Sequence, residues 1–252
     1  MPTQTTSVVS VALVAAGVVA LGASAAVAQP LPPPGPAGGF QQSTLTGTVQ
    51  VFTLTPVGDL DGFLLRNGTE IHTPPHLTRQ LAAVVQPGDQ VQVQGWQSVT
   101  PGVIAAVMMT DARDGQSVVD QGPPPPGTMP PPPPAGYPAP GAQQDSIQGQ
   151  IQQTLHGPHG DINGALLADG TQLRMPPPAA YQVASLLQPG QTIAAQGFVL
   201  STGYGRVMDV QAAGPSPGRL MQLTPGIGVP PPPGGPGAPP PPPSDGAGPA
   251  PR

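Results

Sequence analysis

An internal duplication constrains this chain more than any other feature of its sequence. Residues 58–76 read GDLDGFLLRNGTEIHTPPH and residues 160–178 read GDINGALLADGTQLRMPPP. The two copies align without a gap at an offset of 102 residues, from Gly47/Gly149 to Gly95/Gly197, and 19 of these 49 positions are identical. Because solenoid repeats have much shorter periods, of about 20–50 residues, this offset predicts two separate domains with the same fold.

Proline and glycine confine the folded sequence to the two copies and their flanks. The chain has 42 Pro and 35 Gly among 252 residues, a content typical of long extended segments when no Gly-X-Y period is present. Pro runs favour polyproline II, which builds no core, and we interpret them as spacers rather than as ligands of Pro-recognition domains. We predict a Pro/Gly-rich segment at 29–42, a domain at 43–112, a Pro-rich linker at 113–144, a second domain at 145–213 and a disordered Pro/Gly-rich tail at 214–252.

Residues 1–28 predict a signal peptide. Residues 7–28 are uncharged and mostly Val, Ala and Leu, and they end in Ala26-Val27-Ala28, whose small side chains fit a signal peptidase site. The preceding residues lack Lys and Arg, so an uncleaved membrane anchor is the alternative, because the stretch is just long enough to span a bilayer. We expect a periplasmic or secreted protein after cleavage near Ala28, with membrane contact only through an uncleaved segment.

Each copy shows a pattern of five strands and one helix. In the first copy, alternation and β-branched residues predict strands at 44–54, 62–66, 69–73, 91–96 and 103–109. The second and third strands flank Asn67-Gly68, which predicts a two-residue type I′ turn with φ > 0 at both residues. Leu77, Leu81, Val84 and Val85 predict a helix between the third and fourth strands.

This element order resembles the OB-fold, a small Greek-key barrel. The glycine in the first strand, Gly47, and the Asn67-Gly68 hairpin support the resemblance, which covers both copies. We therefore predict a mainly β protein with two OB-fold-like five-stranded barrels, each with one helix between strands 3 and 4. An SH3-like barrel is the alternative, but it would not need the helix. The motif also resembles small exported bacterial proteins of unknown function, a resemblance that implies no activity.

The resemblance implies a binding surface on the second and third strands. A two-residue turn would pair Leu65 with Glu70 and Phe63 with His72, which places these four side chains on one face of the hairpin. OB-folds usually bind ligands on this face. We therefore predict a contact patch of Phe63, Glu70 and His72, with Arg174 at the position of His72 in the second copy.

Metal and cofactor sites have little support in the sequence. Asp59, Asp61 and Glu70 lack the spacing of a calcium loop, and Asp59 is interpreted as a turn residue. Imidazole can bind transition metals, and the weak candidates are His72, His76, His156 and His159. We predict no cofactor.

Charge and composition narrow the function further. The chain has no Lys, no Cys, seven scattered Arg and a net charge of −5, so a nucleic-acid partner is not expected. It shows no nucleophile–base set, paired acids or phosphate loop, and we predict that it is not an enzyme. The hypothesis is a non-catalytic binding protein of the bacterial envelope, with a protein, glycan or small ligand as partner. Single-stranded nucleic-acid or oligosaccharide binding by the OB-fold, or metal binding through His pairs, is the alternative.

Overall fold

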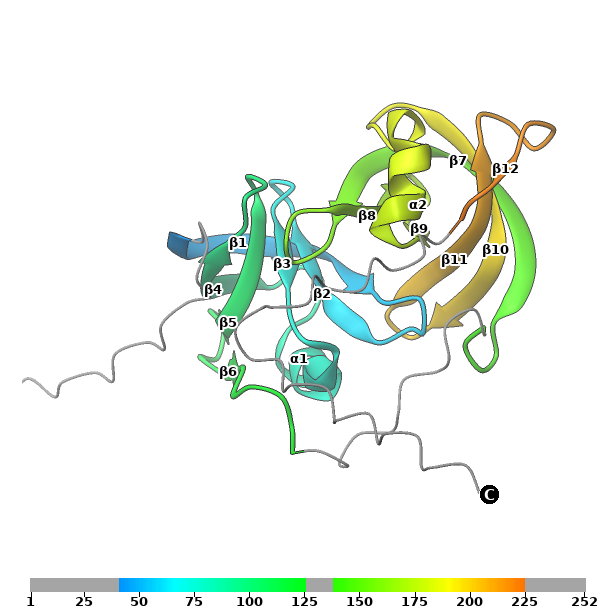
Figure 1. The fold of residues 1–252 in the computed structure, drawn as a ribbon. Coiled ribbons are helices and arrows are strands. Elements are labelled where there is room, and N and C mark those ends of the chain that lie inside the picture. Colours follow the sequence, from blue (N-terminus) through cyan, green and yellow to red (C-terminus); the bar gives the residue numbers. More distant parts are fainter. Residues whose placement is uncertain (1–40, 126–137, 225–252) are drawn as a thin grey trace, which may run out of the picture. The chain divides into compact units, whose positions relative to one another are not determined.

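The computed structural model describes residues 41–125 and 138–224 (Figure 1). These ranges form two mainly β domains, each a closed five-stranded barrel, and both lie in one compact unit. The predicted signal peptide and residues 225–252 of the predicted tail lie outside the described residues. Over the described ranges, no helix combines the length and apolar character needed to cross a membrane.

The first barrel closes through a parallel strand pairing. Its strands are β1 (Gln41–Leu54), β2 (Leu60–Leu65), β3 (Glu70–His72), β4 (Gln90–Gln97) and β5 (Val103–Asp111). The long strand β1 pairs antiparallel with both β2 and β4, and β4 pairs with β5. Parallel pairing of β3 with β5 then closes the barrel. The 3-10 helix η1 (Pro75–Leu77) and helix α1 (Thr78–Val84) connect β3 to β4.

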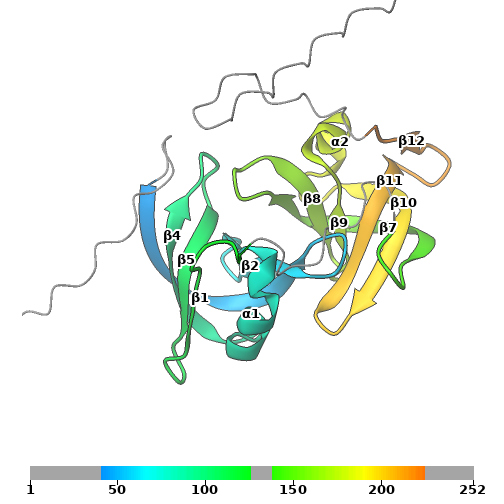
Figure 2. The same ribbon diagram turned by 60° about the horizontal axis from the view of Figure 1, so that its bottom comes forward.

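The second barrel repeats this arrangement. Its strands are β7 (Gln143–His156), β8 (Ile162–Leu167), β9 (Gln172–Arg174), β10 (Thr192–Thr202) and β11 (Gly205–Gly214). Strand β7 pairs with β8 and β10, and parallel pairing of β9 with β11 closes the barrel. Helix α2 (Pro177–Gln182) and the 3-10 helix η2 (Ala184–Leu186) lie between β9 and β10, and α2 packs against β8 (Figure 2).

The predicted fold class is confirmed for both copies. Each copy has five strands in a closed barrel and a short helix between the third and fourth strands, the order typical of an OB-fold. Two short strands extend the sheets into segments expected to lack structure. These are β6 (Ser117–Val119), which pairs with β5, and β12 (Met221–Gln222), which pairs with β11. Both cover a strand edge that would otherwise be open for pairing.

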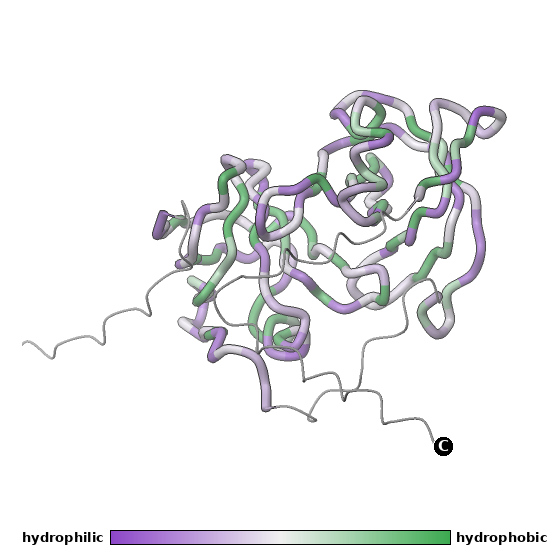
Figure 3. The backbone as a smooth tube through the Cα atoms, viewed as in Figure 1, coloured by the Kyte–Doolittle hydropathy of each residue, from purple (hydrophilic) through white to green (hydrophobic). Residues whose placement is uncertain are grey.

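Each barrel has its own hydrophobic core. The first core includes Phe52, Phe63, Leu65 and Leu81, and the second includes Leu167, Leu173 and Met208, all buried. Apolar residues, green in Figure 3, recur along the strands because alternate side chains of a strand point into the barrel. The apolar residues predicted for the first helix reach the same core through Leu77, Leu81 and Val85.

The β2–β3 hairpin differs from the prediction by one residue. The Leu65 amide donates to the Thr69 carbonyl and the Gly68 amide donates to the Leu65 carbonyl, so three residues form the loop. Only Gly68 has positive φ, at 86°, whereas a type I′ turn would require it at Asn67 as well. This is a type I turn followed by a glycine bulge, and the second copy repeats it at Gly170.

Glycine is also required where β2 and β3 come closest together. Gly62 lies opposite His72 with φ of 144°, and a Cβ atom there would lie 1.8 Å from the Ile71 carbonyl oxygen. The equivalent Gly164 would place a Cβ 1.9 Å from the Leu173 carbonyl oxygen. The shared glycines of the duplicated motif are therefore explained by backbone geometry.

Candidate functional site

The shift of one residue in the hairpin reverses which side chains face outward. Leu64, not Leu65, lies opposite Glu70, and Phe63 lies opposite Ile71. A slip of one residue moves every side chain of a strand to the other face. Phe63 is therefore fully buried in the first core and is separated from Glu70 and His72, with which it was predicted to share a face.

The outer faces of the two β2–β3-type hairpins meet each other. Leu64, Leu155 and Leu166 form a buried cluster with Val51 packed against it, and Leu64 and Leu166 are equivalent residues of the two copies. Such a contact between matching surfaces is the arrangement of a two-fold symmetric dimer, here formed within one chain. The face that OB-folds usually offer to ligands is thus covered by the other barrel.

Hydrogen bonds around this cluster follow the same approximate symmetry. Glu70 Oε2 accepts from the His156 amide at 2.8 Å, and Gln172 Oε1 accepts from the equivalent Leu54 amide at 2.9 Å. The Gln172 Nε2 group also donates to the Phe52 carbonyl at 2.7 Å. The second oxygen of the Glu70 carboxylate cannot donate a hydrogen bond as Gln172 Nε2 does, so it needs a different kind of partner.

Glu70 forms a charged contact within this cluster. Its Oε1 lies 2.7 Å from His156 Nδ1, and its Oε2 lies 3.8 Å from His72 Nε2. Burial alone would raise the pKa of Glu70, but the hydrogen bonds from the His156 ring and amide, with the nearby His72, outweigh burial and lower the pKa. Glu70 is thus held as a carboxylate inside the contact.

Arg174 occupies the equivalent position to His72 and is fully paired. Its Nε donates to the Leu54 carbonyl at 2.8 Å, its Nη1 to Asn163 Oδ1 at 2.8 Å, and its Nη2 to both carboxylate oxygens of Asp61. Its side chain is 3% exposed. Because each nitrogen of the buried guanidinium donates to an acceptor, Arg174 stabilises the contact between the barrels.

His72 and its neighbour Thr73 are buried without such pairing. His72 is 6% exposed and Thr73 is 5% exposed. Neither His72 Nε2 nor the Thr73 hydroxyl has a hydrogen-bond partner. Buried polar atoms are nearly always paired, because leaving one unpaired costs about 1–3 kcal/mol. These two atoms therefore mark a place that the fold does not complete by itself.

Both residues line a cavity of about 360 Å³ beside the contact. Its apolar wall contains Pro74, Pro75, Ala105 and Ala106 of the first barrel, with Pro158 from the β7–β8 connection. Two carboxylates, Asp61 and Asp120, line it as well. The cavity has the size of a small-molecule site, which is typically apolar with a few polar groups.

A second cavity of about 330 Å³ lies at the equivalent place in the other barrel. It is lined by Asn163, Arg174 and Met175, the counterparts of Asp61, His72 and Thr73. Its polar groups are already engaged, since Arg174 holds both Asn163 and Asp61. Asp209 also lines this cavity, and burial raises its pKa. Of the two cavities, only the first is lined by buried side chains whose polar atoms have no partner.

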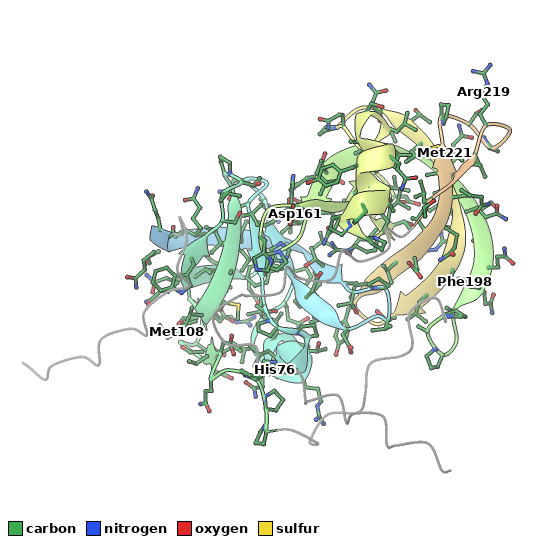
Figure 4. The ribbon with its side chains drawn as sticks, in the orientation of Figure 1. His76, Met108, Asp161, Phe198, Arg219 and Met221 are labelled. Atoms are coloured by element: carbon green, nitrogen blue, oxygen red, sulfur yellow. The ribbon has the colours of Figure 1, made fainter. Side chains whose placement is uncertain are left out.

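The remaining predicted histidines lie apart from one another. His76, at the start of the first helical segment (Figure 4), lies 3.6 Å from Asp120. His159 is exposed in the β7–β8 turn. Among residues 41–125 and 138–224, no group of three or more His, Asp or Glu side chains is placed to hold a metal ion. The structure thus brings together Glu70, His72 and His156, but not His76 and His159.

Sequence reasoning missed several residues of this region. Asp61 pairs with Arg174, Thr73 lines the cavity, and Asn163 supports Arg174, yet none of the three was predicted as a site residue. The signal that could have found them is a difference between the copies. Asp61/Asn163, His72/Arg174 and Thr73/Met175 are all polar differences inside an otherwise shared motif.

Comparison with known proteins gives little further information. No protein-family model and no curated protein matches the sequence. Among solved structures, the chain is similar to the single-stranded DNA binding protein from Thermus aquaticus, at 14% identity with a TM-score of 0.19, covering 73% of this chain and 92% of that one. A deletion mutant of the same protein matches at 13% identity and a TM-score of 0.19, covering 73% and 94%. A TM-score this low carries no information about a ligand.

Proposed function

We propose that this is an exported, non-catalytic binding protein of the bacterial envelope, which holds a small ligand in the cavity beside His72. The observation that carries the proposal is a cavity of about 360 Å³ lined by His72 and Thr73, two buried residues whose Nε2 and hydroxyl make no hydrogen bond. A bound ligand would supply the missing hydrogen bonds, and without one their burial only lowers stability.

A binding role also agrees with how the duplicated faces are used. The contact between the barrels takes up Glu70, Gln172 and Arg174, so these side chains serve the fold. The first cavity keeps buried side chains whose polar atoms make no hydrogen bond. Its size and apolar wall suit a small ligand, which we therefore favour among the three partners expected from the sequence.

The test uses indole as a neutral, mostly apolar probe on the full chain. We expect saturable NMR shift changes confined to the residues of the first cavity, including the His72 ring and the Thr73 methyl. The equivalent residues Arg174 and Met175 provide the internal control and should not shift. Shift changes at Arg174 and Met175 as large as those in the first cavity, or none anywhere, would contradict the proposal.

Single-stranded nucleic acid is the competing ligand suggested by the fold class. The β2–β3 face is covered by the other barrel, and Arg174 is neutralised by Asp61, so neither offers a phosphate site. We expect no change in the fluorescence anisotropy of a labelled oligothymidine at low salt. A salt-sensitive increase on adding the chain would favour the competing ligand instead.

Export is tested separately. We expect the chain expressed in a bacterium to accumulate outside the cytoplasm with Gln29 as its first residue, which N-terminal sequencing measures. Recovery of Ala28→Phe as an uncleaved, membrane-bound form would support the cleavage site. A cytoplasmic chain with an intact N-terminus would overturn the export proposal without affecting the cavity.

A further inference from the structure

We infer that the first cavity takes a small primary amine with an apolar body. This inference rests on the proposed binding function and adds the chemical class of the ligand. It follows from three properties of the cavity, which are its apolar wall, its two unpartnered polar side chains and the surplus of carboxylates around it.

The apolar wall selects the body of the ligand. Prolines and alanines supply rigid or short side chains that cannot fill the space themselves. A flat ring or compact hydrocarbon would cover this wall and exclude water from it, which is the favourable term for binding a small molecule. The volume of about 360 Å³ accommodates one ring system with a short side chain.

The unpartnered atoms select a hydrogen-bonding head group. A neutral imidazole has one donor and one acceptor, and a threonine hydroxyl can do both. An ammonium group offers three donors, enough to reach the Thr73 hydroxyl oxygen and the carboxylates of Asp61 and Asp120 together. His72 Nε2 and the Thr73 hydroxyl are closed off from solvent in the free protein, so binding must turn these side chains about χ1.

Charge selects the sign of the head group. Asp61 and Asp120 line the cavity, and Glu70 lies behind His72. The facing cations are Arg174, which pairs with Asp61, and the histidines His76 beside Asp120 and His156 beside Glu70. Two carboxylates thus line the cavity and a third lies next to it, against one permanent cation. A positive ligand is attracted and a carboxylate ligand is repelled, more strongly in a partly buried site than in water.

The test compares three indoles that differ only in the head group: tryptamine, tryptophol and indole-3-acetate. Calorimetry on the full chain at pH 7 should show tryptamine binding about tenfold or more tightly than indole-3-acetate, with tryptophol between them. Equal affinities, or tighter binding of the acid or the alcohol, would overturn the amine class while leaving the cavity as a binding site. If none of the three binds, the proposed function fails as well.

A pair of matched variants locates the amine at this site. Thr73→Val removes the unpartnered hydroxyl at nearly constant volume, so it should raise the stability of the free protein and weaken tryptamine binding at least about fivefold. Thr53→Val is the control, because the Thr53 hydroxyl is also buried and unpartnered but Thr53 does not line the cavity. It should raise stability and leave tryptamine affinity unchanged.

The variants also separate a ligand contact from a packing effect. Loss of tryptamine affinity in Thr53→Val, or unchanged affinity in Thr73→Val, would overturn the placement of the head group. His72→Gln keeps a polar side chain and should weaken tryptamine without abolishing folding, which circular dichroism checks. In the unaltered chain, bound tryptamine should shift the His72 ring resonances, whereas those of the exposed His159 stay in place.

Discussion

The two barrels use the same position for opposite purposes. In the second barrel, Arg174 fills its position and satisfies Leu54, Asn163 and Asp61. In the first barrel, His72 holds the equivalent position, and its Nε2 makes no hydrogen bond and lies 3.8 Å from Glu70 Oε2. The difference teaches that one copy completes the contact, whereas the other leaves a cavity with open hydrogen-bonding groups. Under the proposed function, stability and binding are divided between two copies of one motif.

Removing the guanidinium from the second barrel should have the largest effect. Arg174→Met leaves the Asp61 carboxylate and the Leu54 carbonyl without their partner in a buried contact. Breaking a buried ion pair on one side costs about 3–5 kcal/mol. Urea unfolding of the full chain measures this loss. A loss below about 1 kcal/mol would mean that Arg174 does not hold the barrels together.

Glu70 and Gln172 are equivalent residues, but replacing each by the other's side chain should lower the free energy of unfolding by different amounts. Gln172→Glu would direct a carboxylate oxygen at the Phe52 carbonyl and should destabilise by about 2–3 kcal/mol. Glu70→Gln keeps the acceptor for the His156 amide and loses only the charged contact, at about 1–2 kcal/mol. Equal losses in urea unfolding would show that the two positions are interchangeable.

Glu70 also predicts a pH dependence. Its pKa is lower in the folded state, so its contribution to stability is present above the ordinary glutamate pKa of about 4.3 and is lost as the pH falls through the folded value. The free energy of unfolding should therefore decline in acid, and less steeply in Glu70→Gln. Parallel pH profiles of the two proteins would contradict this assignment.

The hairpin glycines should behave alike in both copies. Gly68 and Gly170 have φ of 86° and 85°, and alanine in this region costs about 1–2 kcal/mol. We expect Gly68→Ala and Gly170→Ala to lower the free energy of unfolding by similar amounts and to leave tryptamine affinity unchanged. A large difference in stability, or loss of affinity in only one variant, would mean that the turn is more than shared scaffold.

The smallest effect is expected at the exposed ion pair of the second barrel. Arg206 and Asp145 lie 2.9 Å apart with 39% and 46% of their side chains exposed. Exposed pairs contribute about 0–1 kcal/mol, so Arg206→Met should change the free energy of unfolding very little. This variant is the control for Arg174→Met, since both remove a guanidinium from the same barrel.

The barrels could be predicted from the sequence because the features that specify their strands, helix and turns are local. Alternation along the strands, the helical spacing from Leu77 to Val85 and the breaks at Pro and Gly each depend on near neighbours. The same signals occur in both copies, so each predicted element had two independent supports. Residues such as Gly62 and Gly164 were shared for a backbone reason that the structure makes explicit.

The candidate site was harder to predict because it depends on register and on long-range contacts. Asn67-Gly68 fits a two-residue and a three-residue loop equally well, and the choice decides whether Phe63 or Leu64 faces outward. Arg174 meets Asp61 across 113 residues, and His156 meets Glu70 across 86. No local pattern encodes such pairs, so the covered face and the cavity beside it could be found only in three dimensions.

Joining the two matching faces in one polypeptide has a consequence for how they can change over generations. In a symmetric homodimer, a substitution at the shared surface is present in both subunits. An acidic residue placed near the symmetry axis therefore lies close to the same acidic residue of the other subunit. Within one chain the substitution enters once. Position 61 could hold an acid opposite Arg174 while Asn163 is neutral, and buried polar atoms without a partner could arise beside the cavity of one half while the other half preserved the assembly.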